Sequence, residues 1–90
     1  MTELRPIGSE ASSPYGTVAA GGAEAVRAGI STLENGGNAV DAAVATVLAL
    51  NVTDHGACSI GGEAPMLVYE ARSGSVFSLS GQGRAPLDPA

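Results

Sequence analysis

The sequence contains no lysine and no tryptophan, one cysteine, one histidine and only 3% aromatic residues. Its four basic residues are arginines, and the formal net charge is −5. Binding to nucleic acid or to an anionic membrane surface needs a basic patch, so this composition argues against both partners. A single cysteine excludes an internal disulfide framework, and one histidine leaves a zinc site short of ligands. We therefore expect no metal and no cofactor.

Targeting signals are also missing from the pattern. Residues 1–14 are polar and acidic, without the basic patch and apolar run of a signal peptide. The longest apolar run, within residues 39–50, is too short to span a membrane. We expect a cytoplasmic protein and interpret the sequon at Asn51 as coincidental.

The most informative stretch runs from Asn35 to Asn51. Gly36 and Gly37 are typical of the end of a helix, because glycine adopts positive φ without a Cβ clash. Asn38 is a good N-cap for the next helix, and Asp41 places a negative charge in its first turn. The pattern thus predicts a first helix over residues 23–34 and a second over residues 39–50.

The second predicted helix is apolar on nearly every face. Between Ala42 and Leu50 only Thr46 is polar. Such a helix must be buried on nearly every side, but a chain of 90 residues has little material with which to surround it. Gly29 in the first helix costs about 1 kcal/mol relative to alanine, and a close helix–helix crossing would explain its presence.

The remaining segments predict an α+β fold. We expect a flexible lead-in over residues 1–16, a short strand over residues 17–20, and a helix pair made antiparallel by its short link. Residues 51–65 have no clear periodicity and are interpreted as an ordered loop. Residues 66–70 and 75–80 predict a half-covered β-hairpin, and residues 81–90 predict a loop that contains Pro86 and Pro89.

Three motifs suggest chemistry but have simpler explanations. Gly21-Gly22 precedes a helix, as phosphate-binding glycines do, but the dinucleotide fingerprint and the P-loop lysine are missing. Asp54 and His55 lie near Cys58 and Ser59, yet their spacing alone does not give a nucleophile, a base and an orienting group. Arg84 has the geometry to bind a carboxylate with two hydrogen bonds, although a lone loop arginine is usually solvated.

The order of segments resembles a known family. NGGNAVDAAVA, followed by IGGEAPMLVYEARSG and then GQGRAP, is similar to the start of the large subunit of gamma-glutamyltranspeptidases. The resemblance covers residues 17–86 and is closest to the transpeptidase-like amide hydrolases. It implies that residues 17–90 form part of an N-terminal-nucleophile hydrolase, an αββα sandwich.

The resemblance also implies an activity and partners. Members cut their own precursor, a zymogen, into a large and a small subunit. The threonine that begins the small subunit acts as nucleophile and, through its amine, as base. They transfer or hydrolyse gamma-glutamyl groups, typically those of glutathione. No threonine of this chain matches that motif, so no catalytic residue is expected here. The expected partners are the rest of the large subunit, the small subunit and a small amide substrate.

Two departures from the family concern the substrate. The family has an Arg-Glu pair after this hairpin, whose arginine binds the substrate α-carboxylate, and Gln82 and Gly83 stand at these positions. Gln82 can hydrogen-bond a carboxylate but carries no charge, and Arg84 lies two residues further along the chain. Glu63-Ala64-Pro65 stands where the family more often has glycines and phenylalanine. Gln82 and Arg84 are thus the expected substrate-binding residues, and a different acyl group is a serious alternative to gamma-glutamyl.

Two hypotheses follow. The first is the leading segment of a gamma-glutamyltransferase-like enzyme, inactive by itself. The second is a free-standing, non-enzymatic interaction module of the same family that covers its apolar helix by forming oligomers.

Overall fold

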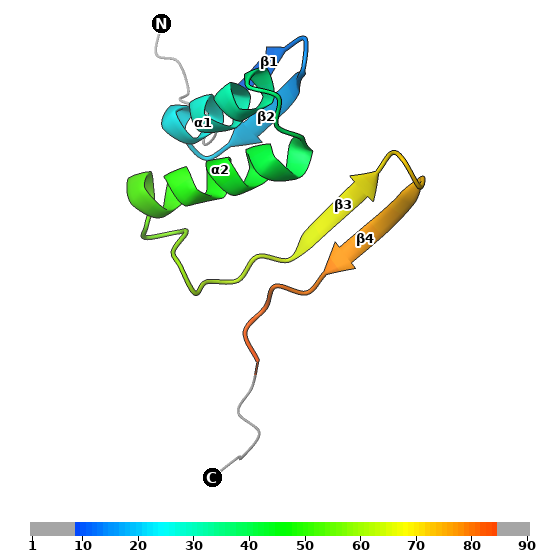
Figure 1. Ribbon diagram of the computed structural model, residues 1–90. Helices are drawn as coiled ribbons and strands as arrows, with labels where there is room; N and C mark the ends of the chain where they lie inside the picture. Colours follow the sequence, from blue (N-terminus) through cyan, green and yellow to red (C-terminus); the bar gives the residue numbers. More distant parts are fainter. Residues whose placement is uncertain (1–8, 85–90) are drawn as a thin grey trace, which may run out of the picture. The chain divides into compact units, whose positions relative to one another are not determined.

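The computed structural model describes residues 9–84, which form two compact units divided between Ile60 and Gly61. The first unit contains strands β1 (Ser9–Ser13) and β2 (Gly16–Ala20) and helices α1 (Ala23–Glu34) and α2 (Ala39–Thr53). The second unit contains strands β3 (Met66–Glu70) and β4 (Ser75–Leu79). Figure 1 shows these elements in chain order. The fold is α+β, compatible with a segment of the sandwich that the resemblance implies.

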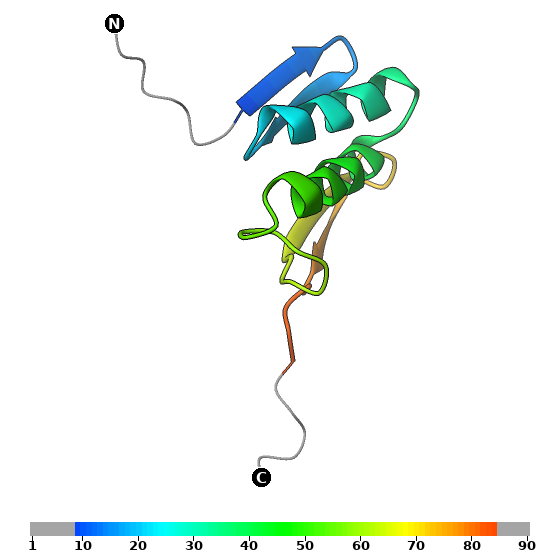
Figure 2. The same ribbon diagram turned by 90° about the vertical axis from the view of Figure 1, so that its left-hand side faces the viewer.

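Helix α1 is the centre of the first unit. It contacts β1, β2 and α2, whereas α2 has few contacts with β2. Figure 2 shows the β1–β2 hairpin lying along α1. The buried side chains belong to the two helices: Ala25, Val26 and Leu33 from α1, and Ala42 and Thr46 from α2. This small core holds the hairpin and the two helices together.

The end of α1 is formed as the sequence predicts. Gly36 has φ +95°. Its N–H donates to the Leu33 carbonyl at 3.1 Å, and the Gly37 N–H donates to the Thr32 carbonyl at 2.9 Å. This pair of bonds is a Schellman motif, which satisfies carbonyls that have no partner inside the helix. The chain direction then reverses, so that α2 runs back past α1 (Figure 1).

Helix α2 begins with a capping box. The Asp41 N–H donates to Asn38 Oδ1 at 2.9 Å, and the Asn38 N–H donates to Asp41 Oδ2 at 3.0 Å. Two backbone donors at the helix start are satisfied in this way. The helix continues to Thr53, three residues beyond the predicted end at Leu50. Neither helix of the described chain is long and apolar enough to cross a membrane.

The crossing predicted at Gly29 is confirmed. Gly29 is buried. A Cβ at this position would collide with Thr46 Oγ1 and would lie 3.0 Å from Val18 Cγ1. Glycine therefore lets α1 approach both α2 and β2 more closely than any residue with a side chain.

Strand β1 was not expected. It pairs antiparallel with β2, from Ser9 opposite Ala20 to Ser13 opposite Gly16. Residues 9–13, which we expected to belong to a flexible lead-in, thus form a paired strand, and residues 1–8 lie outside the described chain. Whether a domain begins at residue 17 stays a prediction. The polar sequence of β1 does not indicate a strand, because its order comes from pairing with β2 and from contacts with α1.

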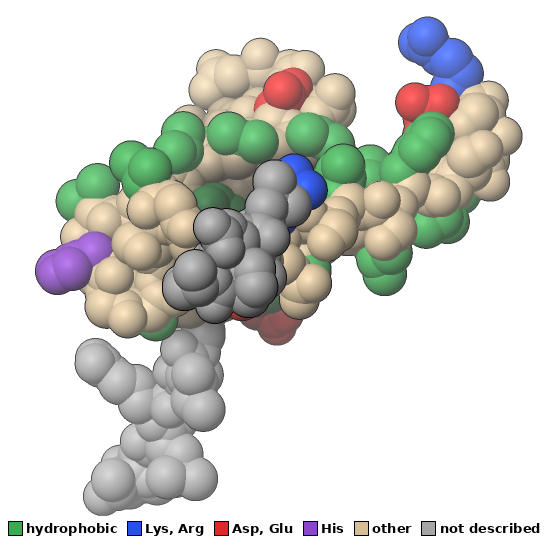
Figure 3. All heavy atoms as spheres, turned by 90° about the horizontal axis from the view of Figure 1, so that it is seen from below, with side chains coloured by type: hydrophobic (Ala, Val, Ile, Leu, Met, Phe, Trp, Pro, Cys, Tyr) green, Lys and Arg blue, Asp and Glu red, His purple; other side chains and the backbone are tan. Residues whose placement is uncertain are grey.

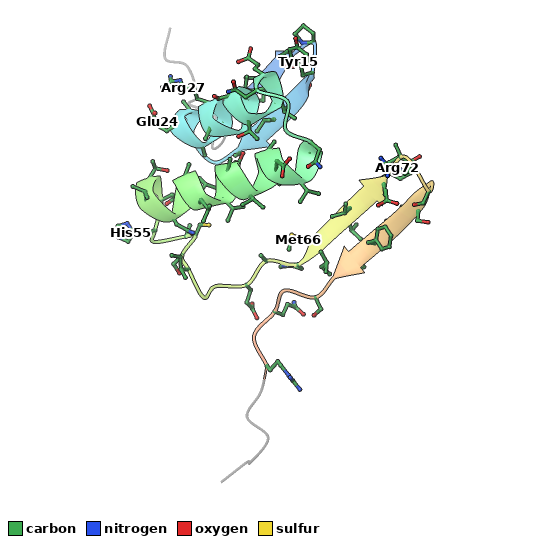
Figure 4. The ribbon with its side chains drawn as sticks, viewed as in Figure 1. Tyr15, Glu24, Arg27, His55, Met66 and Arg72 are labelled. Atoms are coloured by element: carbon green, nitrogen blue, oxygen red, sulfur yellow. The ribbon has the colours of Figure 1, made fainter. Side chains whose placement is uncertain are left out.

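The second unit is the predicted β3–β4 hairpin. Its antiparallel register runs from Met66 opposite Leu79 to Glu70 opposite Ser75. The Gly74 N–H donates to the Glu70 carbonyl at 2.9 Å and closes the turn, where Figure 4 shows Arg72. Only Val68 in these strands is even half-buried. The hairpin itself is confirmed, and the cover expected over one of its faces stays a prediction.

Candidate functional site

The segment with the expected substrate-binding residues leaves β4 directly. Gln82 and Arg84 are both exposed. The chain before β3 lies beside this segment, because the Ala64 N–H donates to the Gly81 carbonyl at 2.7 Å. A Cβ at Gly81 would collide with the Ala64 carbonyl, so the two backbones are in close contact. The hairpin therefore fixes the point from which Gln82 and Arg84 project.

A carboxylate makes the second contact between these two chains. Glu63 Oε2 accepts a hydrogen bond from the Gly83 N–H at 3.1 Å. Continuing the β3–β4 register past Met66 and Leu79 places Glu63 opposite Gln82, and the Ala64–Gly81 bond fits this continuation. A hydrogen bond to a charged acceptor is stronger than a neutral one. Glu63, Gln82 and Arg84 thus belong to one group at the open end of the hairpin.

Glu63 was noticed in the sequence only as a departure from the family pattern. The signal that identifies it as part of this group is the hairpin register, which can be extended from the strand pairs. The sequence alone did not indicate this extension, because Pro65 has no N–H to donate to a strand ladder and would be expected to end the pairing.

The Asp54–Ser59 cluster is not assembled as a nucleophilic site. The Asp54 carbonyl accepts the N–H groups of Ala57 and Cys58, at 3.0 and 2.9 Å, and so shapes the turn after α2. Cys58 Sγ donates to Asn51 Oδ1 at 3.3 Å. His55 is exposed in the turn that follows α2 (Figure 4), and no hydrogen bond joins it to Ser59 or Cys58 among the described residues. These residues have a structural role in the turn.

The threonine hydroxyls of the described chain form hydrogen bonds with nearby residues. Thr32, Thr46 and Thr53 donate their hydroxyl protons to carbonyls four residues earlier in their own helices, at 2.9, 2.8 and 3.2 Å. Thr17 shares a hydrogen bond with the Ser12 hydroxyl. None of these four has a base beside its hydroxyl, as a threonine nucleophile needs.

A large apolar surface lies on α2. Five of its side chains are exposed although they are valine or leucine: Val40, Val44, Val47, Leu48 and Val52. Leu48 is 54% exposed and Val52 79%. We call these five residues the open face of α2. Figure 3 shows hydrophobic side chains in green on the surface of the molecule, with His55 in purple at its edge.

A groove of about 660 Å³ lies beside this helix in the first unit. It is bounded by β2 and its preceding turn, by Leu33, and by residues of α2 that include Ala42, Ala43, Thr46, Val47 and Leu50. Its lining is mostly apolar and includes no carboxylate, histidine, cysteine or arginine; the phenol of Tyr15 is its one ionisable group. The groove therefore offers packing surface rather than a place for acid–base chemistry.

Comparison with known proteins gives the family. The model of the gamma-glutamyltranspeptidase family matches residues 25–89, more than half of the chain. The glutathione hydrolase proenzyme of Bacillus subtilis subsp. natto is 42% identical over 71 residues, which is 79% of this chain. The glutathione hydrolase proenzyme of Escherichia coli (strain K12) is 41% identical over 71 residues, also 79% of this chain. The chain belongs to the gamma-glutamyltranspeptidase family.

The relatives are much longer than this chain. The aligned part covers 12% of the Bacillus subtilis subsp. natto protein and 12% of the Escherichia coli protein. A second Bacillus subtilis protein, from strain 168, is 43% identical over 58 residues, 64% of this chain and 10% of its own length. All three are named as proenzymes, which are precursors.

Proposed function

We propose that these 90 residues are the leading segment of a longer gamma-glutamyltransferase-like enzyme. Its relatives are glutathione hydrolase proenzymes, and the chain corresponds to only 12% of their length. The enzyme would hydrolyse or transfer gamma-glutamyl or related acyl amides, with glutathione as the reference substrate. The nucleophile would be a threonine outside this chain, freed by self-cleavage of the precursor.

The open face of α2 is the structural observation that carries this proposal. A helix with five exposed valine and leucine side chains leaves apolar area in water, at a cost of roughly 25 cal/mol per Å². Covering this face by the rest of the precursor removes that cost. The threonine hydroxyls bonded to helix carbonyls agree with a nucleophile that lies elsewhere.

Within that enzyme the segment from Gln82 to Arg84 would form one wall of the acyl pocket. The hairpin presents both side chains to solvent, and the contacts of Gly81 and Gly83 hold the segment in place. Gln82 offers an amide to hydrogen-bond the substrate, and Arg84 offers a cation.

The experiment is expression of the complete coding sequence, followed by intact-mass measurement and an amidase assay. We expect two subunits, the smaller beginning with threonine, and release of glutamate from glutathione or of an acyl group from anilides. An uncleaved chain with no activity on any of these amides would contradict the proposal. Residues 1–90 alone should show no turnover.

The open face of α2 also supports a second candidate, a non-enzymatic module that buries this face against another copy of itself. Sedimentation of the 90-residue chain separates the two candidates. A compact oligomer favours the module, whereas an aggregating or unstructured chain favours the enzyme segment.

A further inference from the structure

One carboxylate lies against the candidate acyl segment. Glu63 Oε2 is 3.1 Å from the Gly83 nitrogen, and the neighbouring Ala64 N–H is bonded to the Gly81 carbonyl at 2.7 Å. These two contacts hold the start of the β3 arm to the segment that follows β4. The side chain of Glu63 is thus tied to the backbone between Gln82 and Arg84.

The place of Glu63 in the register brings its charge close to Gln82. In an antiparallel pair, residues directly opposite each other have Cβ atoms about 4.5–5.5 Å apart. The paired strands end at Met66 and Leu79, but the Ala64–Gly81 hydrogen bond follows the same register, and by that register Glu63 falls opposite Gln82. A ligand group that hydrogen-bonds the Gln82 amide would therefore lie within a few ångströms of a negative charge.

No ion pair neutralises this charge within residues 9–84. The one salt bridge of that part joins Arg27 to Glu24, on α1 in the other unit (Figure 4). The Gly83 N–H gives the carboxylate a hydrogen bond but no positive charge. Glu63 therefore adds a negative charge to the field at Gln82, beside the positive charge that Arg84 supplies two residues further on.

We propose that Glu63 is a specificity-determining residue that selects the acyl group by charge. The inference rests on the proposed function, in which Gln82 lines the acyl pocket. An acyl group that ends in a carboxylate meets a like charge there, whereas a neutral or ammonium-bearing acyl group does not. Proteins often gain specificity by repelling the wrong ligand as well as by attracting the right one.

Three 4-nitroanilides test the idea on the complete, processed enzyme: glutaryl, pentanoyl and 5-aminopentanoyl. All three acyl groups contain five carbon atoms. At the end far from the anilide, glutaryl carries a negative charge, pentanoyl none and 5-aminopentanoyl a positive charge. Glu63→Gln keeps an oxygen acceptor for the Gly83 N–H and removes the charge. We expect the ratio of kcat/KM for glutaryl to that for pentanoyl to rise about tenfold, and the ratio for 5-aminopentanoyl to pentanoyl to fall. Glu70→Gln, an exposed change at the far end of β3, is the matched control and should leave both ratios unchanged.

A second measurement varies the ionic strength. Added salt screens the repulsion, so the glutaryl-to-pentanoyl ratio of the unaltered enzyme should rise with ionic strength, and this rise should disappear in Glu63→Gln. Ratios insensitive to both salt and the substitution would overturn the role of Glu63 while leaving the amidase proposal standing. A processed enzyme that hydrolyses none of the three anilides, nor glutathione, would overturn both.

Discussion

Gly29 of α1 faces Thr46 of α2 so closely that a Cβ on the glycine would collide with the threonine hydroxyl. The same hydroxyl donates to the Ala42 carbonyl at 2.8 Å, so it is held in place within its own helix. Val18 of β2 closes the other side, 3.0 Å from the same Cβ position. The packing of both helices and the strand thus depends on the missing side chain of one residue.

Gly29→Ala should therefore destabilise the protein. Alanine gains about 1 kcal/mol in helix propensity, but overpacking of a close contact costs about 1–3 kcal/mol. We expect a net loss of up to about 2 kcal/mol in the free energy of unfolding, measured by chemical denaturation of the complete protein. Gly56→Ala is the control, since a Cβ there meets nothing within 4 Å and should change stability little.

Asn38→Ala should remove half of the capping box of α2. The Asp41 N–H loses its acceptor, Asn38 Oδ1, now 2.9 Å away. The expected cost is about 1 kcal/mol. Asn38→Asp keeps an acceptor and should lose much less. Equal stability of the alanine and aspartate variants in thermal unfolding would show that the cap contributes nothing.

Gln82→Arg should shift substrate preference. A guanidinium binds a carboxylate with two charged hydrogen bonds, which the amide of Gln82 cannot do. Activity of the processed enzyme on gamma-glutamyl anilide, divided by its activity on pentanoyl anilide, should rise about tenfold. Arg72→Gln at the hairpin turn serves as control. An unchanged ratio would remove Gln82 from the acyl pocket.

Leu48→Asn on the open face of α2 should benefit the isolated 90-residue chain but destabilise the complete protein. In the 90-residue chain Leu48 is 54% exposed, so asparagine should raise solubility without loss of structure. In the complete protein, where we propose that this face is buried, the change should cost about 2–4 kcal/mol and reduce folded yield. Solubility assays and denaturation curves of both forms give the comparison. A harmless substitution in the complete protein would mean that the face stays in water.

The sequence predicted the helices and the β3–β4 hairpin because their signals are local. Gly36 and Asn38 mark the boundary between α1 and α2, and both act through bonds to residues a few positions away. Strand β1 was missed for the opposite reason. Residues 9–13 read SEASS, without apolar alternation, and their order comes from pairing with β2.

The candidate site was likewise predicted only in part from the sequence. Gln82 and Arg84 came from the resemblance to a family and from arginine chemistry, and the structure adds their exposure and the backbone that holds them. Glu63 lies twenty residues earlier than Gly83, so no local pattern joins the two. Only the register of the hairpin brings them together.

Amide hydrogen exchange across α2 tests the central claim most directly. We predict that amides of residues 42–53 exchange rapidly in the isolated 90-residue chain and are strongly protected in the complete protein, where the open face would be covered. Equal, strong protection in a monomeric 90-residue chain would contradict the claim, because the helix would then need no further polypeptide to cover it.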